Sequence, residues 1–310
     1  HNLKSLYNNV ANRGIRTREI IDNVIKSGIF CFQLDSGNDC VFTVEYQHGR
    51  MHGHHAKDTL IDMRSRALLL MNTDSKAETS ETTKKKENLG KFVLYVNIAL
   101  EIGQLLTNLH TSGHFEYKLY KKRMKASGLN SLKEDLDMEY SSWCARLEEC
   151  REKHYWMNFI FGQQLHVIHD FLETGIDKDR VLSMLKFIHP DVQIDGMKEF
   201  YAKQSFKMSD SSILYKIAQT LDYALKNLQP FSRPVDTSFT VSSRITDFIR
   251  PGKLSVIALD ENSNMVMKVM LALYNNTVRK LPEPHQVLFC SKDTMWVEIE
   301  LLLHRCVKSD

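Results

Sequence analysis

Apolar residues that recur at every third or fourth position dominate the middle of this chain, and this spacing constrains the fold more than any other feature. The clearest series consists of Leu132, Leu136, Tyr140, Trp143 and Leu147. Positions three and four apart lie on one face of an α-helix, whereas a half-buried strand alternates at every second residue. The middle of the chain is therefore predicted to be helical, and the fold class to be mainly α.

Near the N-terminus the pattern changes from helical to strand-like. Residues 29–34 and 40–46 are rich in aromatic and β-branched side chains, and the sequence DSGND between them is typical of a turn. We therefore expect a β-hairpin here. With a helix on either side of it, residues 1–72 are predicted to form a helix–hairpin–helix α+β subdomain.

Shifts in composition divide the rest of the chain. Residues 73–90 are polar, with almost no apolar side chains to offset the entropy of ordering, so we expect a mobile loop. Residues 91–230 are predicted to form a helical linker subdomain, and residues 231–310 a small α/β unit of βαβα order. Its expected elements are strand 254–259, helix 266–273, strand 287–290 and helix 295–307. The predicted fold is a helical bundle or linker with an N-terminal β-hairpin and a small C-terminal α/β unit.

Charge and hydropathy argue against two classes of partner. The formal net charge of +3 is too small to attract nucleic acid strongly, and we expect no nucleic-acid partner. The most apolar window, residues 92–109, is interrupted by Asn97, Glu101 and Gln104, whereas a membrane span needs about 20 nearly uncharged residues. A buried helix is therefore expected there instead of a membrane span.

The sequence SVIALDE ends on two acids, Asp260 and Glu261, and has the shape of a Walker B element. In such an element a strand delivers one acid to Mg²⁺ and a second acid to the attacking water. That chemistry also needs a phosphate-binding loop of pattern G-x-x-x-x-G-K-[ST]. The two Gly-Lys pairs of the chain, at Gly90 and Gly252, lack both the earlier glycine and the following Ser or Thr. Because Asp260 as the N-cap of the next helix explains the residues equally well, a nucleotide site at Asp260 and Glu261 is an alternative only.

Four histidines crowd the sequence QHGRMHGHH. Imidazole is a common metal ligand, and His48 with His52 or His54 would reach one ion. The spacing matches no known closed site, and the two glycines favour a solvated loop with weak metal affinity. His48, His52 and His54 therefore remain candidate metal ligands beside that simpler reading. The six cysteines form no close pairs of the kind that a zinc site needs, so no cofactor is expected in this segment.

Residues 114–125 mix aromatic side chains with lysines and one arginine. Such a stretch is able to lie on RNA or on a lipid surface. A solvated helix end whose tyrosines pack inward is the simpler interpretation, and we expect it. The chain also lacks a G-x-S-x-G nucleophile motif, so the sequence contains no complete catalytic motif.

Residues 281–306, LPEPHQVLFCSKDTMWVEIELLLHRC, resemble the stretch just ahead of the AAA+ core in the mysterin family. The matching positions are Leu281, Pro282, Val287, Leu288, Cys290, Thr294, Glu298, Leu301, Leu302, Leu303, Arg305 and Cys306. Weaker similarities lie at residues 112–115, 154–165 and 250–261, in the same order along the chain. The resemblance is therefore spread over most of the chain.

This resemblance implies a parent protein that is a giant AAA+ ATPase and RING-type E3 ubiquitin ligase, cytoplasmic and linked to lipid droplets. The chain would then be a non-catalytic linker between an N-terminal stalk and the ATPase ring. Its partners would be neighbouring domains of the same chain, with ubiquitin and a ubiquitin-conjugating enzyme as partners of the parent. ATP, Mg²⁺ and Zn²⁺ would be held only by other modules, because the family's phosphate-binding loops and zinc-binding cysteines have no matching positions here. An α/β nucleotide-binding protein and an independent helical adaptor are the alternatives.

Overall fold

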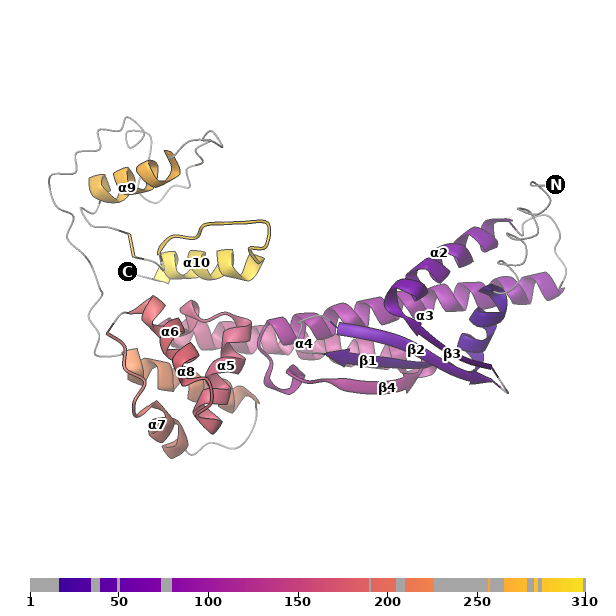
Figure 1. Cartoon of the computed structure of the whole chain (residues 1–310), viewed down its shortest axis with the longest axis horizontal. Coiled ribbons are helices and arrows are strands. Elements are labelled where there is room, and N and C mark those ends of the chain that lie inside the picture. Colours follow the sequence, from indigo (N-terminus) through magenta and orange to yellow (C-terminus); the bar gives the residue numbers. More distant parts are fainter. Residues whose placement is uncertain are drawn as a thin grey trace. The chain divides into compact units, whose positions relative to one another are not determined.

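The computed structural model describes residues 17–34, 40–48, 51–73, 80–189, 191–204, 210–225, 256, 265–277, 282–283 and 286–308. The chain divides into two compact units, which are described separately. The first unit comprises residues 1–149, 162–166 and 209–211, and the second comprises residues 150–161, 167–208 and 212–310. Most elements are helices, beside one small antiparallel sheet (Figure 1). The predicted fold class, mainly α with an N-terminal hairpin region, is therefore confirmed.

The first unit is built around a four-stranded antiparallel sheet with strand order β3-β2-β1-β4. Its strands are β1 (Ile29–Leu34), β2 (Cys40–His48), β3 (Met51–Ala56) and β4 (Lys121–Lys125). The predicted hairpin is confirmed, because β1 pairs with β2 and places Leu34 opposite Cys40. The sheet also contains a strand from the basic stretch 114–125, which we expected to be a helix end. That expectation is wrong, because β4 pairs with the free side of β1.

Two helices cover one face of this sheet. The helical segments of the first unit are residues 17–27, α2 (Lys57–Thr73), α3 (Ser80–Thr111), the short η1 (Phe115–Tyr117) and η2 (Ala126–Gly128), and α4 (Leu129–Lys153), whose last turn passes into the second unit. Helices α2 and α3 pack against the strands (Figure 1). The side chains buried beneath them are Phe30, Phe32, Leu34, Phe42, Val44 and Tyr46, at alternate positions of β1 and β2. Burying such a side chain contributes about 1.5–3 kcal/mol, so this apolar face anchors the unit.

Helix α3 also satisfies the polar groups at the start of β2. The backbone N–H of Cys40 donates to the Thr107 hydroxyl at 3.1 Å. Gly103 lies beside the Phe42 ring, and a Cβ there would sit in ordinary contact at 3.8 Å. By length and composition, residues Lys86–Thr111 are apolar enough to cross a membrane, and 44% of that window is buried inside the unit. The fully buried positions Phe92 and Val96 show that α3 contributes to the core.

The polar segment 73–90, which we expected to be a mobile loop, is helical from Ser80 onward. Residues 74–79 lie outside the described part of the chain. The helical part is held by polar contacts: Lys91 Nζ lies 2.6 Å from Glu87 Oε1, and Asn88 Nδ2 donates to Asp22 Oδ1 at 2.8 Å. The expectation of a loop was wrong for residues 80–90 because the apolar part of the same helix orders them.

Close backbone contact joins the end of α3 to the start of α5 (Gly162–Thr174). Gly113, just after α3, has a φ of +84°, a conformation that favours glycine. A Cβ on Gly113 would overlap the carbonyl of Gly162, and a Cβ on Gly162 would overlap the carbonyl of Thr111. Both positions therefore require glycine.

Trp143 of α4 fills the space beside this contact. Its side chain is fully buried, and its indole N–H donates to the carbonyl oxygen of Ser112 at 3.2 Å. The indole packs against His114 and Phe115, with ring centroids 4.5 Å and 5.5 Å away. Trp143 thus joins α4 to the segment that follows α3.

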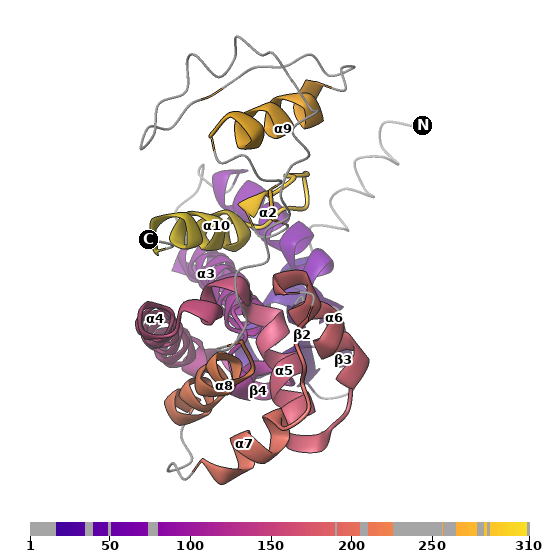
Figure 2. The same cartoon turned by 90° about the vertical axis from the view of Figure 1, so that its left-hand side faces the viewer.

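The second unit is helical in its described part. Its elements are η3 (Tyr155–Phe159), most of α5, α6 (Lys178–Ile188), α7 (Met197–Lys203), α8 (Asp210–Leu225), α9 (Met265–Thr277) and α10 (Trp296–Lys308). Helix α5 lies among α6, α7 and α8 (Figure 2). Leu185 of α6 and Leu221 of α8 are fully buried. Helices α6 and α8 lie within residues 91–230, which we predicted to be helical.

The C-terminal region contains the two predicted helices, α9 and α10, but differs in its strands. Residues 287–290, predicted to be a strand, lie outside any strand, and Phe289 and Cys290 are exposed. That prediction is wrong because these residues have no neighbouring strand in the described part of the chain. Of the predicted strand 254–259, only Val256 is described, also outside any strand.

Helix α10 packs on η3 through one basic side chain. The Arg305 guanidinium donates to the carbonyl oxygen of Asn158 at 2.8 Å and lies 5.3 Å from the centre of the Phe159 ring. Burial lowers the pKa of Arg305 from its usual value. Three apolar side chains of α10 remain exposed: Trp296, Leu303 and Val307.

Candidate functional site

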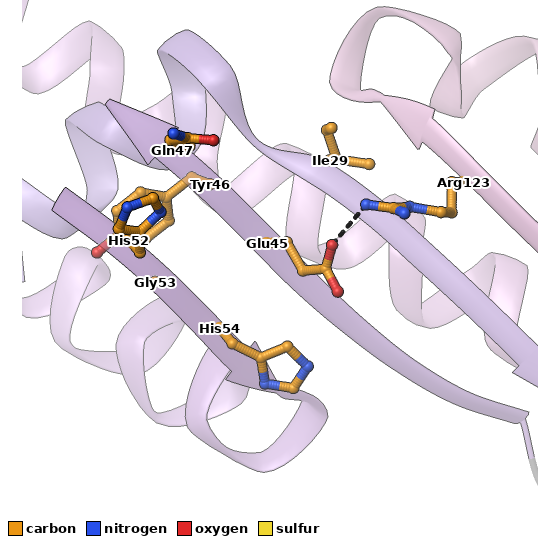
Figure 3. Close-up of a pocket in the computed structure, with 8 residues that line it drawn as sticks. All are labelled: Ile29, Glu45, Tyr46, Gln47, His52, Gly53, His54 and Arg123. Atoms are coloured by element: carbon orange, nitrogen blue, oxygen red, sulfur yellow. Dashed lines mark hydrogen bonds and ion pairs between the residues drawn. The ribbon is translucent and has the colours of Figure 1, made fainter. Parts of the chain in front are cut away.

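A depression lies on the face of the sheet opposite α2 and α3. We call this the outer face; it carries Ile29, Cys31, Gln33, Thr43, Glu45, Gln47, His52, His54, Lys121, Arg123 and Lys125. Strand alternation places these residues on the same side of the sheet. The depression has a volume of about 470 Å³ and is lined by Ile29, Glu45, Tyr46, Gln47, His52, Gly53, His54 and Arg123 (Figure 3).

An ion pair crosses the outer face. Arg123 Nη2 of β4 lies 2.6 Å from Glu45 Oε2 of β2, so the two side chains bridge over β1 (Figure 3). The two side chains are 58% and 41% exposed, and a pair this exposed stabilises a fold by at most about 1 kcal/mol. Its main consequence is therefore geometric, since it holds Glu45, the only acid among the described residues of the outer face, against a base.

Cys31 lies on the same face beside this pair but is a poor nucleophile. Burial, and secondarily the Glu45 carboxylate, raises the pKa of the Cys31 thiol from its usual value, although Arg123 acts in the opposite direction. A protonated thiol attacks carbonyl groups weakly. The outer face therefore offers donors and acceptors for binding a ligand, without an activated cysteine.

The structure places the predicted metal-ligand histidines in a hairpin instead of a loop. His52 and His54 are exposed, share the outer face, and lie opposite Gln47 and Glu45. His48 is the last residue of β2 and pairs with Met51. Within the described residues, no three or more His, Cys, Asp or Glu side chains are placed to hold a metal ion. Metal binding by His48, His52 and His54 stays a prediction.

The neighbouring His55 lies on the other face of β3. Its ring stacks on Tyr46, with centroids 5.7 Å apart. Burial, and secondarily the charge of His54, lowers the pKa of His55 from its usual value. His55 is therefore a neutral packing residue near pH 7.

Gly53 is required by this packing. The Tyr46 ring lies across Gly53, so that a Cβ at position 53 would overlap the ring. We expect Gly53→Ala to destabilise the first unit by about 1–3 kcal/mol, because the ring has to leave its place beside His55. Urea unfolding followed by circular dichroism measures this. His52→Ala, which changes an exposed side chain on the same strand, is the matched control with an expected change within about 0.5 kcal/mol. Equal stability of the Gly53→Ala chain and the original would contradict the prediction.

The acids of the proposed Walker B element, Asp260 and Glu261, lie outside the described residues. The nucleotide site therefore remains a sequence-based alternative with no geometry to support it.

A histidine–carboxylate pair in the second unit was missed by sequence reasoning. His154 Nδ1 lies 2.6 Å from Asp222 Oδ2, and the His154 ring packs edge-on against Tyr215 at 5.8 Å between centroids. A carboxylate orients histidine in this way in catalytic triads, which also need a nucleophile. No hydroxyl or thiol group of the described residues hydrogen-bonds to the His154 ring. The pair therefore joins η3 to α8, and only the three-dimensional structure brings residues 68 positions apart together.

Comparison with known proteins gives two related matches. The family model of the RNF213 AAA domain matches residues 256–310, which include α9 and α10. The zebrafish (Danio rerio) protein named E3 ubiquitin-protein ligase rnf213-beta is 20% identical to this chain over 352 aligned residues. The alignment covers 89% of the chain but 7% of the relative's length, so the chain spans a small part of that protein.

Proposed function

We propose, from the relationship of this chain to the mysterin (RNF213) family, that it is a non-catalytic structural segment leading into the AAA domain of a giant E3 ubiquitin ligase. The observation that carries this proposal is the position of the family match. The match to the AAA domain is confined to residues 256–310, while the similarity to the zebrafish ligase extends over most of the chain. The preceding sheet and helices would then form the linker between a stalk and the ATPase ring.

Exposed apolar side chains in the matched region support this proposal. Trp296, Leu303 and Val307 of α10 are 72%, 51% and 76% exposed. Several large apolar side chains exposed on one helix are typical of a surface that packs against further protein. In this proposal the remainder of the AAA domain covers them.

The proposal assigns the chemistry to other parts of the parent. The chain contains no phosphate-binding loop, so ATP and Mg²⁺ would be held elsewhere, as would the Zn²⁺ of a ligase module. Ubiquitin and a ubiquitin-conjugating enzyme would be partners of the parent, in the cytoplasm or at lipid droplets. This segment would contact only neighbouring domains of its own chain.

ATP hydrolysis tests the non-catalytic role. We expect the purified 310-residue chain to release phosphate from Mg²⁺-ATP no faster than its Asp260→Asn variant, because its sequence contains no phosphate-binding loop. Phosphate release is measured over time with both proteins at equal concentration. Turnover that is lost in the Asp260→Asn variant would overturn the proposal and favour the nucleotide-binding alternative.

The relationship to a larger ligase is tested in the source cells. An antibody raised against the chain should precipitate a protein far larger than 36.0 kDa that forms ubiquitin conjugates when activating and conjugating enzymes are added. A precipitated protein of about the size of the chain, without ubiquitin transfer, would contradict the proposal that the chain belongs to a larger ligase. The ATP measurement would still stand, because it tests the non-catalytic role separately.

A further inference from the structure

Strand β4 lies at the edge of the sheet, beside β1. The backbone N–H of Leu34 donates to the carbonyl of Tyr120 at 2.9 Å, which sets the phase of the β1–β4 ladder. In an antiparallel pair, hydrogen-bonded and non-hydrogen-bonded residues alternate along each strand. Lys122 and Met124 therefore direct their backbone groups to β1, and Lys121, Arg123 and Lys125 direct theirs to the free edge.

The β4 edge is strongly basic. Four of the five residues of β4 are basic, and these four side chains are exposed. Glu45 is the only acid on the outer face of the described sheet, and it is already paired with Arg123 (Figure 3). Lys121 and Lys125 form no ion pair within the described part of the chain. The edge therefore combines backbone hydrogen-bonding groups with positive charge that is not neutralised locally.

Charge complementarity decides which strand fits this edge. A second copy of β4 would place lysines opposite lysines, and like charges directly opposite are unfavourable in a sheet. An acidic strand would place a carboxylate opposite each base, and the backbone ladder would supply sequence-independent affinity. We propose that β4 binds an extended acidic peptide as a fifth strand, with acids at every second position facing Lys121, Arg123 and Lys125. This interaction is independent of the linker role.

Peptide binding tests the proposal directly. The probe is a fluorescently labelled peptide in which glutamate alternates with threonine, and its anisotropy is measured against the full 310-residue chain. Two control peptides test charge and strand formation separately. A lysine–threonine peptide reverses the charge. A glutamate–threonine peptide with two adjacent prolines at its centre stays acidic but lacks a backbone N–H on the side that faces β4, whichever way it binds. We expect the glutamate–threonine peptide to bind, the lysine–threonine peptide not to bind, and the proline peptide to bind at least about tenfold more weakly than the first.

Variants of the chain locate the binding edge. Lys121→Glu combined with Lys125→Glu should weaken peptide binding at least about tenfold, since both bases face the incoming strand. The matched control combines Lys57→Glu and Lys86→Glu, which make the same charge change at exposed helix positions and should leave binding unchanged. Glu45→Gln should tighten binding, because it releases Arg123 from its ion pair.

Three results would overturn the proposal. If the proline peptide bound as tightly as the glutamate–threonine peptide, the attraction would be non-specific and due to charge alone. The same would follow if the Lys57→Glu, Lys86→Glu control lost as much affinity as the Lys121→Glu, Lys125→Glu variant. Tighter binding to vesicles of phosphatidylserine and phosphatidylcholine than to the peptide would identify a membrane surface instead. Circular dichroism of each variant establishes that the chain is folded before binding is compared.

Discussion

Gly162→Ala is expected to destabilise the first unit by at least about 3 kcal/mol. The new Cβ would overlap the carbonyl of Thr111 and the backbone of Ser112, which are main-chain atoms and are unable to rotate away as a side chain would. Gly113 lies against Gly162 and has a φ of +84°, so the opposing turn has little freedom to move. The end of α3 and the start of α5 would have to separate, and the packing around Trp143 would loosen with them.

The loss is measured by urea unfolding monitored by circular dichroism, with the midpoint and the slope both fitted. Gly90→Ala is the matched control, since a Cβ there meets only the Met71 methyl group at 3.8 Å and lies inside α3. Alanine is the better helix former, so this control should be neutral or stabilise the chain by up to about 1 kcal/mol. An unfolding midpoint for Gly162→Ala equal to that of the original chain would show that the backbone contact is not required.

The predictable part of the fold is the part that local patterns specify. The β1–β2 hairpin follows from two apolar strands around turn residues, and helix α10 follows from the spacing of Leu301 and its neighbours. Strand β4 was not predicted because its sequence, KKRMK, has no apolar alternation. It becomes a strand by pairing with β1, which lies about 90 residues earlier in the chain. Tertiary pairing of this kind is invisible to a pattern read along the sequence.

The polar start of α3 shows the same limit in a helix. Taken alone, residues 80–90 bury too little apolar surface to be ordered. They are continuous with the buried positions Phe92 and Val96 of the same helix. Residues 80–90 therefore extend a helix that has already formed, and the unfavourable nucleation step is not needed again. The Glu87–Lys91 ion pair at 2.6 Å contributes a further few tenths of a kcal/mol.

The sequence predicted two residues that lie in the candidate site, His52 and His54, but neither the other lining residues nor the geometry. The crowding of His52 and His54 was visible in the sequence, but the glycines beside them indicated a loop. The structure places the two histidines on β3, which pairs with β2, and the Tyr46 ring lies across Gly53 between them. Arg123 joins the site from β4, and no signal in the sequence relates it to Glu45, 78 positions away.

Trp143→Ala is expected to cost about 3–5 kcal/mol of unfolding free energy, because Trp143 is fully buried and truncation leaves a large cavity beside His114 and Phe115. Trp143→Phe separates packing from hydrogen bonding. It keeps most of the apolar surface but leaves the carbonyl of Ser112 without its indole donor, at a cost of about 1–3 kcal/mol.

Urea unfolding of three variants tests the role of Trp143 in the core. The matched control is Trp296→Ala, which removes a tryptophan that is 72% exposed and should change stability by no more than about 0.5 kcal/mol. The expected order of stability is then Trp296→Ala, Trp143→Phe and Trp143→Ala, from highest to lowest. If Trp143→Ala were as stable as Trp296→Ala, α4 would not depend on the indole for its attachment to the segment after α3. If Trp143→Phe, but not Trp143→Ala, were as stable as the control, packing alone would attach α4 to the segment after α3. The hydrogen bond to Ser112 would then contribute nothing measurable to stability.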